Sequence, residues 1–486
     1  MDPVLVSFIV YTTAIVALGT YSARFAQRSA SDFFLAGRRL GAWVAGLSSS
    51  ASAESGWVTL GLVGMAYKVG AGALWIVVGT FAAFVFNWFV LAWRLRSESE
   101  KHDALTLPDV LAAPFRGPVA VLIRCVGVLI ILSMLTAYVA AQLNAAGKTF
   151  AGTFGWNYPI GVLLGAGIVL LYTVTGGFRA IAWTDVVQAI IMILTMILLP
   201  AILIGKVGGP VAFWEKLGAQ PDGASLTDAF GGKSGFALIG FLALWLGVPL
   251  GNPGQPHVLV RLMAVKDRRA IRRGGMISSA WVLILFTGAV LLGMAARVYF
   301  GHLDDPEQIL PIIARDSSIV PGFIGGMIIA AILAAICSTA DSQLLVAASS
   351  VSHDLLVRVF KMNASLTTKM IIDRAAVVLI GTIATAIALV EVRSVFSFVL
   401  DYGWAGLGAG FGPALILRLC WRRTTGWGVL AGMIVGVATA VIWKQFPDLQ
   451  AQVYNLVPAF ALSMLTIIAV SLGGQRGSTK KVRSWT

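Results

Sequence analysis

The chain has 486 residues, of which 58% are hydrophobic and only 12% charged, and its formal net charge is +14. Soluble proteins carry about 25% charged residues, so this composition excludes a disordered chain, a collagen-like chain and a disulfide scaffold, and it disfavours a soluble enzyme. The basic residues lie in short loops between apolar runs, which argues against a nucleic-acid partner. We therefore expect an all-α integral membrane protein, in which about 20 apolar residues make each crossing.

Thirteen apolar segments are predicted to cross the membrane. The first lacks a basic region before its apolar run, so it is interpreted as a retained helix and not as a cleaved signal. Cysteines 125, 337 and 420 lie within apolar segments, and no disulfides are expected. No soluble domain is expected in the outer loop 205–234 or after residue 473. In chain order the thirteen segments are 4–23, 41–65, 70–94, 118–147, 157–176, 182–204, 235–260, 274–298, 319–350, 371–391, 394–420, 425–443 and 455–472.

Lysines and arginines predict how the segments are oriented. Most of them fall in the C-terminal tail and in loops that begin at Arg24, Arg94, Arg261, Arg358 and Arg418. Thirteen crossings place all of these loops on one side of the membrane. Because cytoplasmic loops are enriched in basic residues, we expect the N-terminus outside and the C-terminus inside.

Two segments carry polar interruptions at mid-depth. The second has five serines, a glutamate and a glycine within residues 48–56, and the seventh has three prolines and three glycines within residues 247–256. Such sequences cannot continue a regular helix, and irregular backbone at membrane depth is tolerated only inside protein or along a wet cavity. The two segments are five apart and cross in opposite directions. This pattern favours a transporter built from two inverted five-helix repeats over two kinked structural helices.

Five motifs on these segments can be compared with known families. They read SASAESGW at 50–57, TVTGGFRAIAWTDVVQA at 173–189, GQPHVLVRLMA at 254–264, AAICSTADSQLLVAASS at 334–350 and WAGLGAGFGP at 404–413. Together they resemble the sodium:solute symporter family, and within it the sodium/proline permeases, from about residue 4 to 445. The resemblance implies the leucine-transporter fold, with ten core helices, one extra helix before them and two after.

The resemblance also implies how the chain is divided. Residues 1–40 form an extra N-terminal helix and a cytoplasmic loop, and residues 41–204 form the first inverted repeat. Residues 205–420 form the second repeat, and residues 421–486 form two C-terminal helices and a short basic tail.

An ionisable residue within a span is costly and therefore a functional candidate, which singles out Glu54, Asp185, Asp341 and Asp401. The resemblance implies a sodium site and no organic cofactor, with sodium as the only metal. For Ser338 and Thr339, whose hydroxyls are among the implied ligands, helix packing by small residues is the alternative to sodium binding. The implied ligands are the carbonyls of Ala51, Glu54 and Ala335 and the hydroxyls of Ser338 and Thr339.

Asp185, Asp341 and Ser342 are candidates for a second ion or for coupling. In some relatives the position of Asp185 helps to bind a second sodium ion, but here the residue serves equally well as a structural hydrogen-bond acceptor. Proline permeases carry an aspartate where this chain has Ala53, and the acid here is one residue later, at Glu54. That shift rotates the side chain by about 100°. Proton coupling through Glu54 or Asp341 therefore stays open.

The resemblance places the substrate between the two breaks, where aromatic walls and a few polar groups suit a small zwitterion. Proline permeases present a tryptophan and a tyrosine where this chain has Val248 and Asn252, so the substrate is not settled. Another amino acid, a betaine-like compound or a small carboxylate fits the residues as well. The implied substrate-binding residues are Ser55, Gly56, Trp57, Tyr138, Gln142, Asn252, Gln255, Pro256 and Trp404.

The sequence thus predicts a sodium-driven importer of a small solute, with proline as the leading candidate, working by alternating access in a bacterial inner membrane. Its partners are the solute, sodium and the lipid bilayer. A proton-coupled importer is the first alternative. A membrane sensor is disfavoured by the short tail, an intramembrane enzyme by the four scattered histidines, and a channel by the lack of a repeated pore loop.

Overall fold

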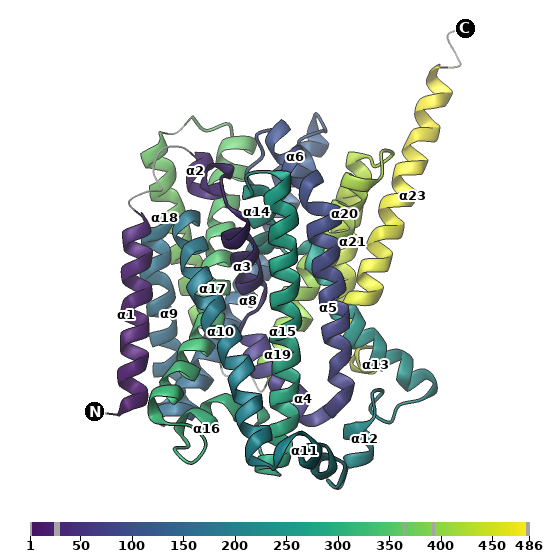
Figure 1. Ribbon diagram of the computed structural model, residues 1–486. Helices are drawn as coiled ribbons and strands as arrows, with labels where there is room; N and C mark the ends of the chain where they lie inside the picture. Colours follow the sequence, from purple (N-terminus) through teal and green to yellow (C-terminus); the bar gives the residue numbers. More distant parts are fainter. Residues whose placement is uncertain (1, 24–29, 364, 391–393, 483–486) are drawn as a thin grey trace.

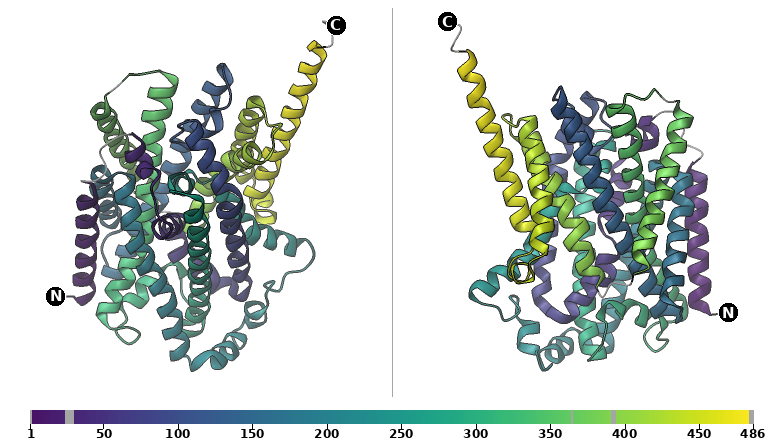
Figure 2. Two further views of the ribbon diagram at one scale, coloured as in Figure 1. Left: turned by 45° about the horizontal axis from the view of Figure 1, so that its top comes forward. Right: turned by 180° about the vertical axis from the view of Figure 1, so that it is seen from behind.

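The computed structural model describes residues 2–23, 30–363, 365–390 and 394–482, and nearly all of this chain is helical. Long helices stand side by side in one bundle, with the N-terminus at one end and the C-terminus at the other (Figures 1 and 2). Four of the basic residues that bear on the predicted orientation lie outside the described residues. They are Arg24, Arg28, Arg393 and Arg483.

The helices of the first half lie close to the predicted segments. In chain order they are α1 (Pro3–Ala23), α2 (Ala30–Leu35), η1 (Ala36–Arg38), α3 (Ala42–Ala53), η2 (Trp57–Leu62), α4 (Val63–Val69), η3 (Gly70–Leu74), α5 (Trp75–Phe86), η4 (Asn87–Leu91), α6 (Ala92–Lys101), α7 (Leu107–Ala112), α8 (Pro118–Phe154), α9 (Tyr158–Gly176), α10 (Phe178–Lys206), α11 (Gly209–Gly218) and α12 (Gly223–Thr227).

The second half repeats the same alternation of long and interrupted helices. These are α13 (Gly235–Gly247), η5 (Val248–Gly254), α14 (Pro256–Ala264), α15 (Arg268–Phe300), η6 (Pro306–Gln308), α16 (Ile309–Arg315), α17 (Gly322–Ser349), η7 (Ser350–Val359), α18 (Leu366–Ala388), α19 (Val395–Phe398), η8 (Val399–Trp404), α20 (Ala405–Cys420), α21 (Gly426–Lys444), α22 (Pro447–Gln452) and α23 (Leu456–Val482).

Ten helical runs among the described residues are long and apolar enough to cross a membrane. One of them, Trp57–Lys101, turns back on itself at η3, where α4 ends and α5 begins (Figure 1). Gly70 at this turn has φ +67°, and a Cβ there would lie 2.2 Å from the carbonyl oxygen of Leu226, so only glycine fits. The run α3–η2–α4, helix α9 and the run α19–η8–α20 also lie on predicted segments, but each is short or interrupted. The expected thirteen crossings therefore stay a prediction.

The two predicted interruptions are real breaks in the helices. Helix α3 ends at Glu54, which has extended backbone angles (φ −101°, ψ +100°), and the chain resumes as the π-helical η2. In the second half, η5 ends at Gln255, whose angles are nearly the same (φ −91°, ψ +101°), before α14 begins at Pro256. The serine-rich and proline-rich stretches thus produce the same local geometry by different means.

The second break packs closely against α20. A Cβ on Gly251 would lie 2.2 Å from Nε1 of Trp404, and a Cβ on Gly408 would lie 2.6 Å from the Cα of Gly251. The glycine-rich motif at 404–413 is therefore explained by this close approach of two backbones.

The two broken helices are tied together at the end of the bundle that carries α2 and α6. The Leu40 amide donates to the carbonyl of Ala264 at 3.1 Å, and the Lys266 amide donates to the carbonyl of Leu40 at 3.1 Å. Arg38 adds hydrogen bonds to Ser99 (2.5 Å) and to the carbonyl of Ala104 (3.0 Å). These contacts join the start of α3 to the end of α14 and close that end of the bundle.

The opposite end is closed by a different group of charges. The Lys148 ammonium on α8 lies 2.8 Å from a carboxylate oxygen of Glu307 on η6 and 3.3 Å from Asp305. Glu307 also accepts from the Ser394 hydroxyl (2.9 Å) and from the Val395 amide (3.1 Å) at the start of α19. Contacts between different helices thus join the chain at both ends of the bundle.

Candidate functional site

Hydroxyl groups on α17 reach across to the carbonyl end of α3. The Ser338 hydroxyl lies 2.9 Å from the carbonyl oxygen of Ala51 and 3.3 Å from that of Ala335. The Thr339 hydroxyl donates to the carbonyl of Ser52 at 3.2 Å, a residue that the sequence did not suggest. Because the end of a helix leaves its last carbonyls without intrahelical partners, the break after α3 makes these oxygens available. The group is a set of buried oxygen ligands of the type that hard cations prefer.

Asp185 lies nearby, fully buried on α10, and the structure gives it a counter-ion. Nη2 of Arg261 is 3.0 Å from its Oδ2, and the same nitrogen donates to the Ser342 hydroxyl at 2.5 Å. The hydroxyls of Ser48 (2.6 Å) and Ser52 (3.2 Å) donate to the same carboxylate oxygen. A guanidinium therefore occupies the place where a second cation was considered.

The expectation that Arg261 belongs to a surface loop is wrong. Helix α14 continues to Ala264 and carries Arg261 inside the protein, where the side chain is 0% exposed and its guanidinium lies over the ring of Phe178 at 5.1 Å. The predicted segment ends at residue 260 because an arginine lowers the local hydropathy. An arginine that is paired with a carboxylate can nevertheless be buried. Asp341, the other coupling candidate, accepts from the Ser342 hydroxyl at 2.9 Å.

A small cavity of about 20 Å³ lies beside the two breaks. Trp57, Tyr138, Asn252 and Trp404, which were predicted to bind substrate, line it. Its complete lining is Ala53, Glu54, Trp57, Thr80, Tyr138, Val248, Pro249, Asn252, Phe286, Val399, Leu400 and Trp404.

The other predicted substrate residues do not line this cavity but hold the breaks in place. The Gly56 amide donates to Oε1 of Gln142 at 2.9 Å, and the Tyr138 hydroxyl lies 3.4 Å from that of Ser55. Nε2 of Gln255 donates to the carbonyls of Gly251 (3.1 Å) and Trp404 (3.2 Å). Pro256 lines a separate cavity, which it shares with Arg261 and Ser342.

Several lining residues carried no recognisable signal in the sequence. Thr80 lies on the apolar helix α5 and Phe286 lies in the apolar middle of α15, so nothing in the sequence marks them as facing a cavity. Asn87 was also missed, although its Nδ2 donates to Oδ1 of Asn252 at 3.0 Å. A buried asparagine in an apolar run is a usable signal, because it needs a partner.

Leu400 separates the cavity from a larger cleft at the periphery. It lines both, whereas Asp401 and Lys444 line only the cleft. Asp401 forms an ion pair with Lys444 and accepts from Nε2 of Gln450 at 2.9 Å. Asp401, one of the four ionisable candidates, is therefore paired outside the cavity.

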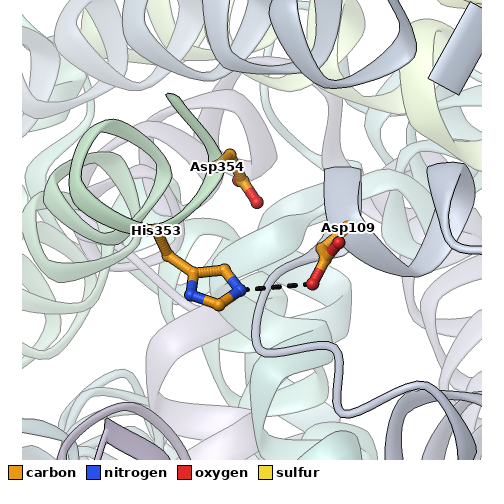
Figure 3. Close-up of side chains that lie close together, drawn as sticks. All are labelled: Asp109, His353 and Asp354. Atoms are coloured by element: carbon orange, nitrogen blue, oxygen red, sulfur yellow. Dashed lines mark hydrogen bonds and ion pairs between the residues drawn. The ribbon is translucent and has the colours of Figure 1, made fainter. Parts of the chain in front are cut away.

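Two further buried carboxylates, Asp109 and Asp354, lie apart from the cavity, where α7 and η7 meet. Asp109, His353 and Asp354 bring ligand atoms within 4.8 Å of one another, and Nε2 of His353 points at Asp109 (Figure 3). Asp109 is also paired with Arg124 (2.8 Å) and Arg358 (3.0 Å), and Asp354 accepts from a threonine hydroxyl. Two guanidinium groups already balance this carboxylate, so the cluster is a structural network between helices.

Comparison with known proteins places the chain among transporters. Residues 33–436 match the sodium:solute symporter family. The osmoregulated proline transporter OpuE of Bacillus subtilis is 36% identical over 99% of this chain and 96% of its own length. The high-affinity proline transporter PutP of the same organism is 38% identical over 91% and 92%. The sodium/proline symporter of Escherichia coli is 35% identical over 98% and 94%.

Solved structures agree in fold. A Na⁺-coupled sialic acid symporter in a substrate-bound outward-open state superimposes with a TM-score of 0.79, at 18% identity, over 97% of this chain and 98% of its own. The nucleobase-cation-symport transporter Mhp1 gives a TM-score of 0.58 at 12% identity over 93% and 96%. These proteins have the leucine-transporter fold, and this chain shares their all-helical architecture. The candidate spans and the bacterial proline transporters that it resembles make it a multi-pass protein of the plasma membrane. From the match over most of its length and from these full-length relatives, the chain belongs to the sodium:solute symporter family.

Proposed function

We propose that this protein is a sodium-coupled symporter that imports proline by alternating access in a bacterial inner membrane. One observation carries the proposal. The Ser338–Ala51 contact and the aromatic cavity both adjoin the break after α3. An ion bound at these oxygens orders the same backbone that forms the cavity wall. The relatives named as proline transporters support proline as the solute.

The coupling follows from this shared backbone. Sodium at Ala51, Glu54, Ala335, Ser338 and Thr339 holds the break open for the solute, and the solute in turn favours sodium, because such coupling is reciprocal. A tenfold sodium gradient and a potential of about 100 mV together supply about 3.7 kcal/mol per ion. This supports roughly 500-fold accumulation at one ion per solute.

One sodium ion per solute is the proposed stoichiometry. Of the three candidates for a second ion or for coupling, the Arg261 guanidinium contacts Asp185 and Ser342, whereas Asp341 accepts from the Ser342 hydroxyl. This guanidinium balances the charge of Asp185, which argues against a second sodium ion there.

The proposed topology has thirteen crossings, with the N-terminus outside and the C-terminus inside. The placement of the termini at opposite ends of the bundle supports an odd number of crossings (Figure 1). The matching breaks at Glu54 and Gln255 support the inverted repeats 41–204 and 205–420, flanked by 1–40 and 421–486.

A proton-coupled symporter is the second candidate, because Glu54 lies in the wall of the cavity and not only at the end of α3. A betaine-like solute or another amino acid remains an alternative to proline, since Val248 and Asn252 replace the aromatic residues of proline permeases. A small carboxylate is the third alternative, and the charge of the cavity wall argues against it.

The test is uptake of labelled proline into proteoliposomes under an inward sodium gradient, an inward proton gradient or neither. Sodium-dependent uptake that unlabelled proline blocks is the expected result. Uptake driven only by protons would overturn the sodium proposal, and the lack of uptake under either gradient would overturn proline as the solute.

A further inference from the structure

Among the described residues that line the cavity, Glu54 is the one with a charged side chain. It is 3% exposed, at the point where α3 ends. Among the described residues no basic side chain forms an ion pair with it, and no donor contacts it. Burying a carboxylate without a counter-charge is costly, so this arrangement needs an explanation.

The rest of the lining consists of neutral groups. Trp57, Tyr138, Phe286 and Trp404 contribute aromatic rings, and the Trp57 and Phe286 ring centroids are 6.1 Å apart. Aromatic faces attract cations through their quadrupoles, and cages of such rings bind ammonium groups in other proteins. The wall therefore combines one negative charge with several surfaces that favour a positive one.

We propose that Glu54 determines substrate specificity by pairing with the cationic nitrogen of the solute. This inference rests on the proposed transport of a small solute and narrows its class to amines, including imino acids and betaine-like compounds. An ammonium group that enters the cavity supplies the counter-charge that the protein lacks. A solute with a carboxylate and no amine instead places two negative charges in one small cavity, which is unfavourable.

The contrast with Asp185 strengthens the argument. The protein provides that carboxylate with a guanidinium and two hydroxyl donors, so it has the means to neutralise a buried acid where structure requires it. Among the described residues, Glu54 has no guanidinium partner and no hydroxyl donor. The partner of Glu54 therefore comes from outside the chain.

The test compares proline with two compounds that each keep half of its charge. Pyrrolidine carries the ring amine without a carboxylate, and tetrahydro-2-furoate carries the carboxylate with a ring oxygen in place of the amine. Binding is measured as protection from thermal unfolding in sodium, and inhibition is measured against labelled proline uptake. In the wild type we expect pyrrolidine to protect and furoate to inhibit at least about 100-fold more weakly than proline.

Glu54→Gln is expected to weaken proline binding by about 30-fold or more and to abolish protection by pyrrolidine, with the response to furoate unchanged or improved. The sodium concentration for half-maximal effect should change less than twofold, because the proposed sodium ligand is the carbonyl and not the side chain. Glu54→Asp, which keeps the charge, should retain the preference for amines. Glu215→Gln, which changes an exposed glutamate outside the cavity, is the matched control.

Three results would overturn the inference. One is furoate inhibiting the wild type as well as proline does, which needs no variant. The second is Glu54→Gln keeping the preference for amines, and the third is this variant losing only the pH dependence of uptake, which would make Glu54 a proton carrier. If the wild type takes up no proline but still binds pyrrolidine through Glu54, proline fails as the substrate and the inference stands.

Discussion

Two buried carboxylates flank the first broken helix, and the structure treats them in opposite ways. Asp185 on α10 is 0% exposed and receives Arg261 and two serine hydroxyls. Glu54 at the end of α3 is 3% exposed and faces a cavity lined by aromatic rings, with no basic side chain of the described chain paired to it. The same chemical group is thus closed into the structure in one place and left open in the other.

The difference shows which process offsets the free-energy cost of burying a charge. At Asp185 an ion pair and hydrogen bonds inside the chain offset this cost when the protein folds. At Glu54 the cost is offset only when a cation binds. The first carboxylate therefore serves mainly stability, whereas the second serves binding.

The largest effect is expected from Arg261→Leu, which turns Asp185 into a second carboxylate without a partner. Removing one member of a buried ion pair costs about 3–5 kcal/mol, so the unfolding temperature should fall strongly. Added sodium should stabilise this variant more than the wild type, because Asp185 and the nearby hydroxyls then have room for a cation. Thermal unfolding with and without sodium measures both effects. Arg272→Leu, which changes an exposed arginine, is the control, and an equal loss in both variants would contradict the argument.

Asp109→Asn extends the comparison to a carboxylate with two guanidinium partners. Burial raises the pKa of Asp109, but the hydrogen bond from His353 and the charges of Arg358 and Arg124 hold it below its ordinary value. The ion pairs therefore stabilise the fold above the ordinary aspartate pKa of about 3.9, and this stabilisation is lost as the pH falls through the folded pKa. We expect a loss of about 2–3 kcal/mol at pH 7.

The measurement is the difference in unfolding temperature between the wild type and Asp109→Asn from pH 7 to pH 3. It should shrink as the pH falls. A difference that stays constant over this range would mean that the charge of Asp109 contributes nothing.

Ser338→Ala tests the proposed sodium site next to Glu54. Ser338 connects α17 to the carbonyl of Ala51, and losing one oxygen ligand should raise the sodium concentration for half-maximal uptake by about tenfold, or about 1.4 kcal/mol. Thr339→Ala should act in the same direction. The control is Ser350→Ala, since within the described part of the chain that hydroxyl bonds only to the carbonyl of Val346 on the preceding turn. Unchanged sodium dependence in Ser338→Ala and Thr339→Ala would remove α17 from the sodium site.

The smallest effect is expected from Asn252→Tyr, which adds an aromatic wall to the cavity that contains Glu54. The hydrogen bond from Asn87 is lost, and a larger ring reduces the space, so the ranking of competing solutes should shift by a few-fold. Competition against labelled proline by a panel of amino acids and betaines measures the shift. An unaltered ranking would place residue 252 outside the substrate path.

Much of the architecture follows from local sequence alone. Runs of about 20 apolar residues must be helices in lipid, because no water is present to satisfy the backbone. The serines at 48–55 and the prolines at 249–256 interrupt two of these helices wherever they lie, so both breaks and their spacing were predictable. The glycines and hydroxyls of the five motifs were sufficient to suggest the family.

The tertiary structure decided which side chains meet. Hydropathy placed Arg261 in a loop, and only the packing of α14 against α3 and α10 shows that it neutralises Asp185. The sequence predicts Ser55, Gly56, Gln142 and Gln255 in the substrate site, and this stays a prediction. Only the structure shows that these residues form hydrogen bonds at the breaks and that Thr80, Phe286 and Leu400 line the cavity. A local pattern determines helices and their interruptions because these depend on neighbours along the chain. The partner of a buried charge depends on residues far apart in sequence, and only the assembled bundle brings them together.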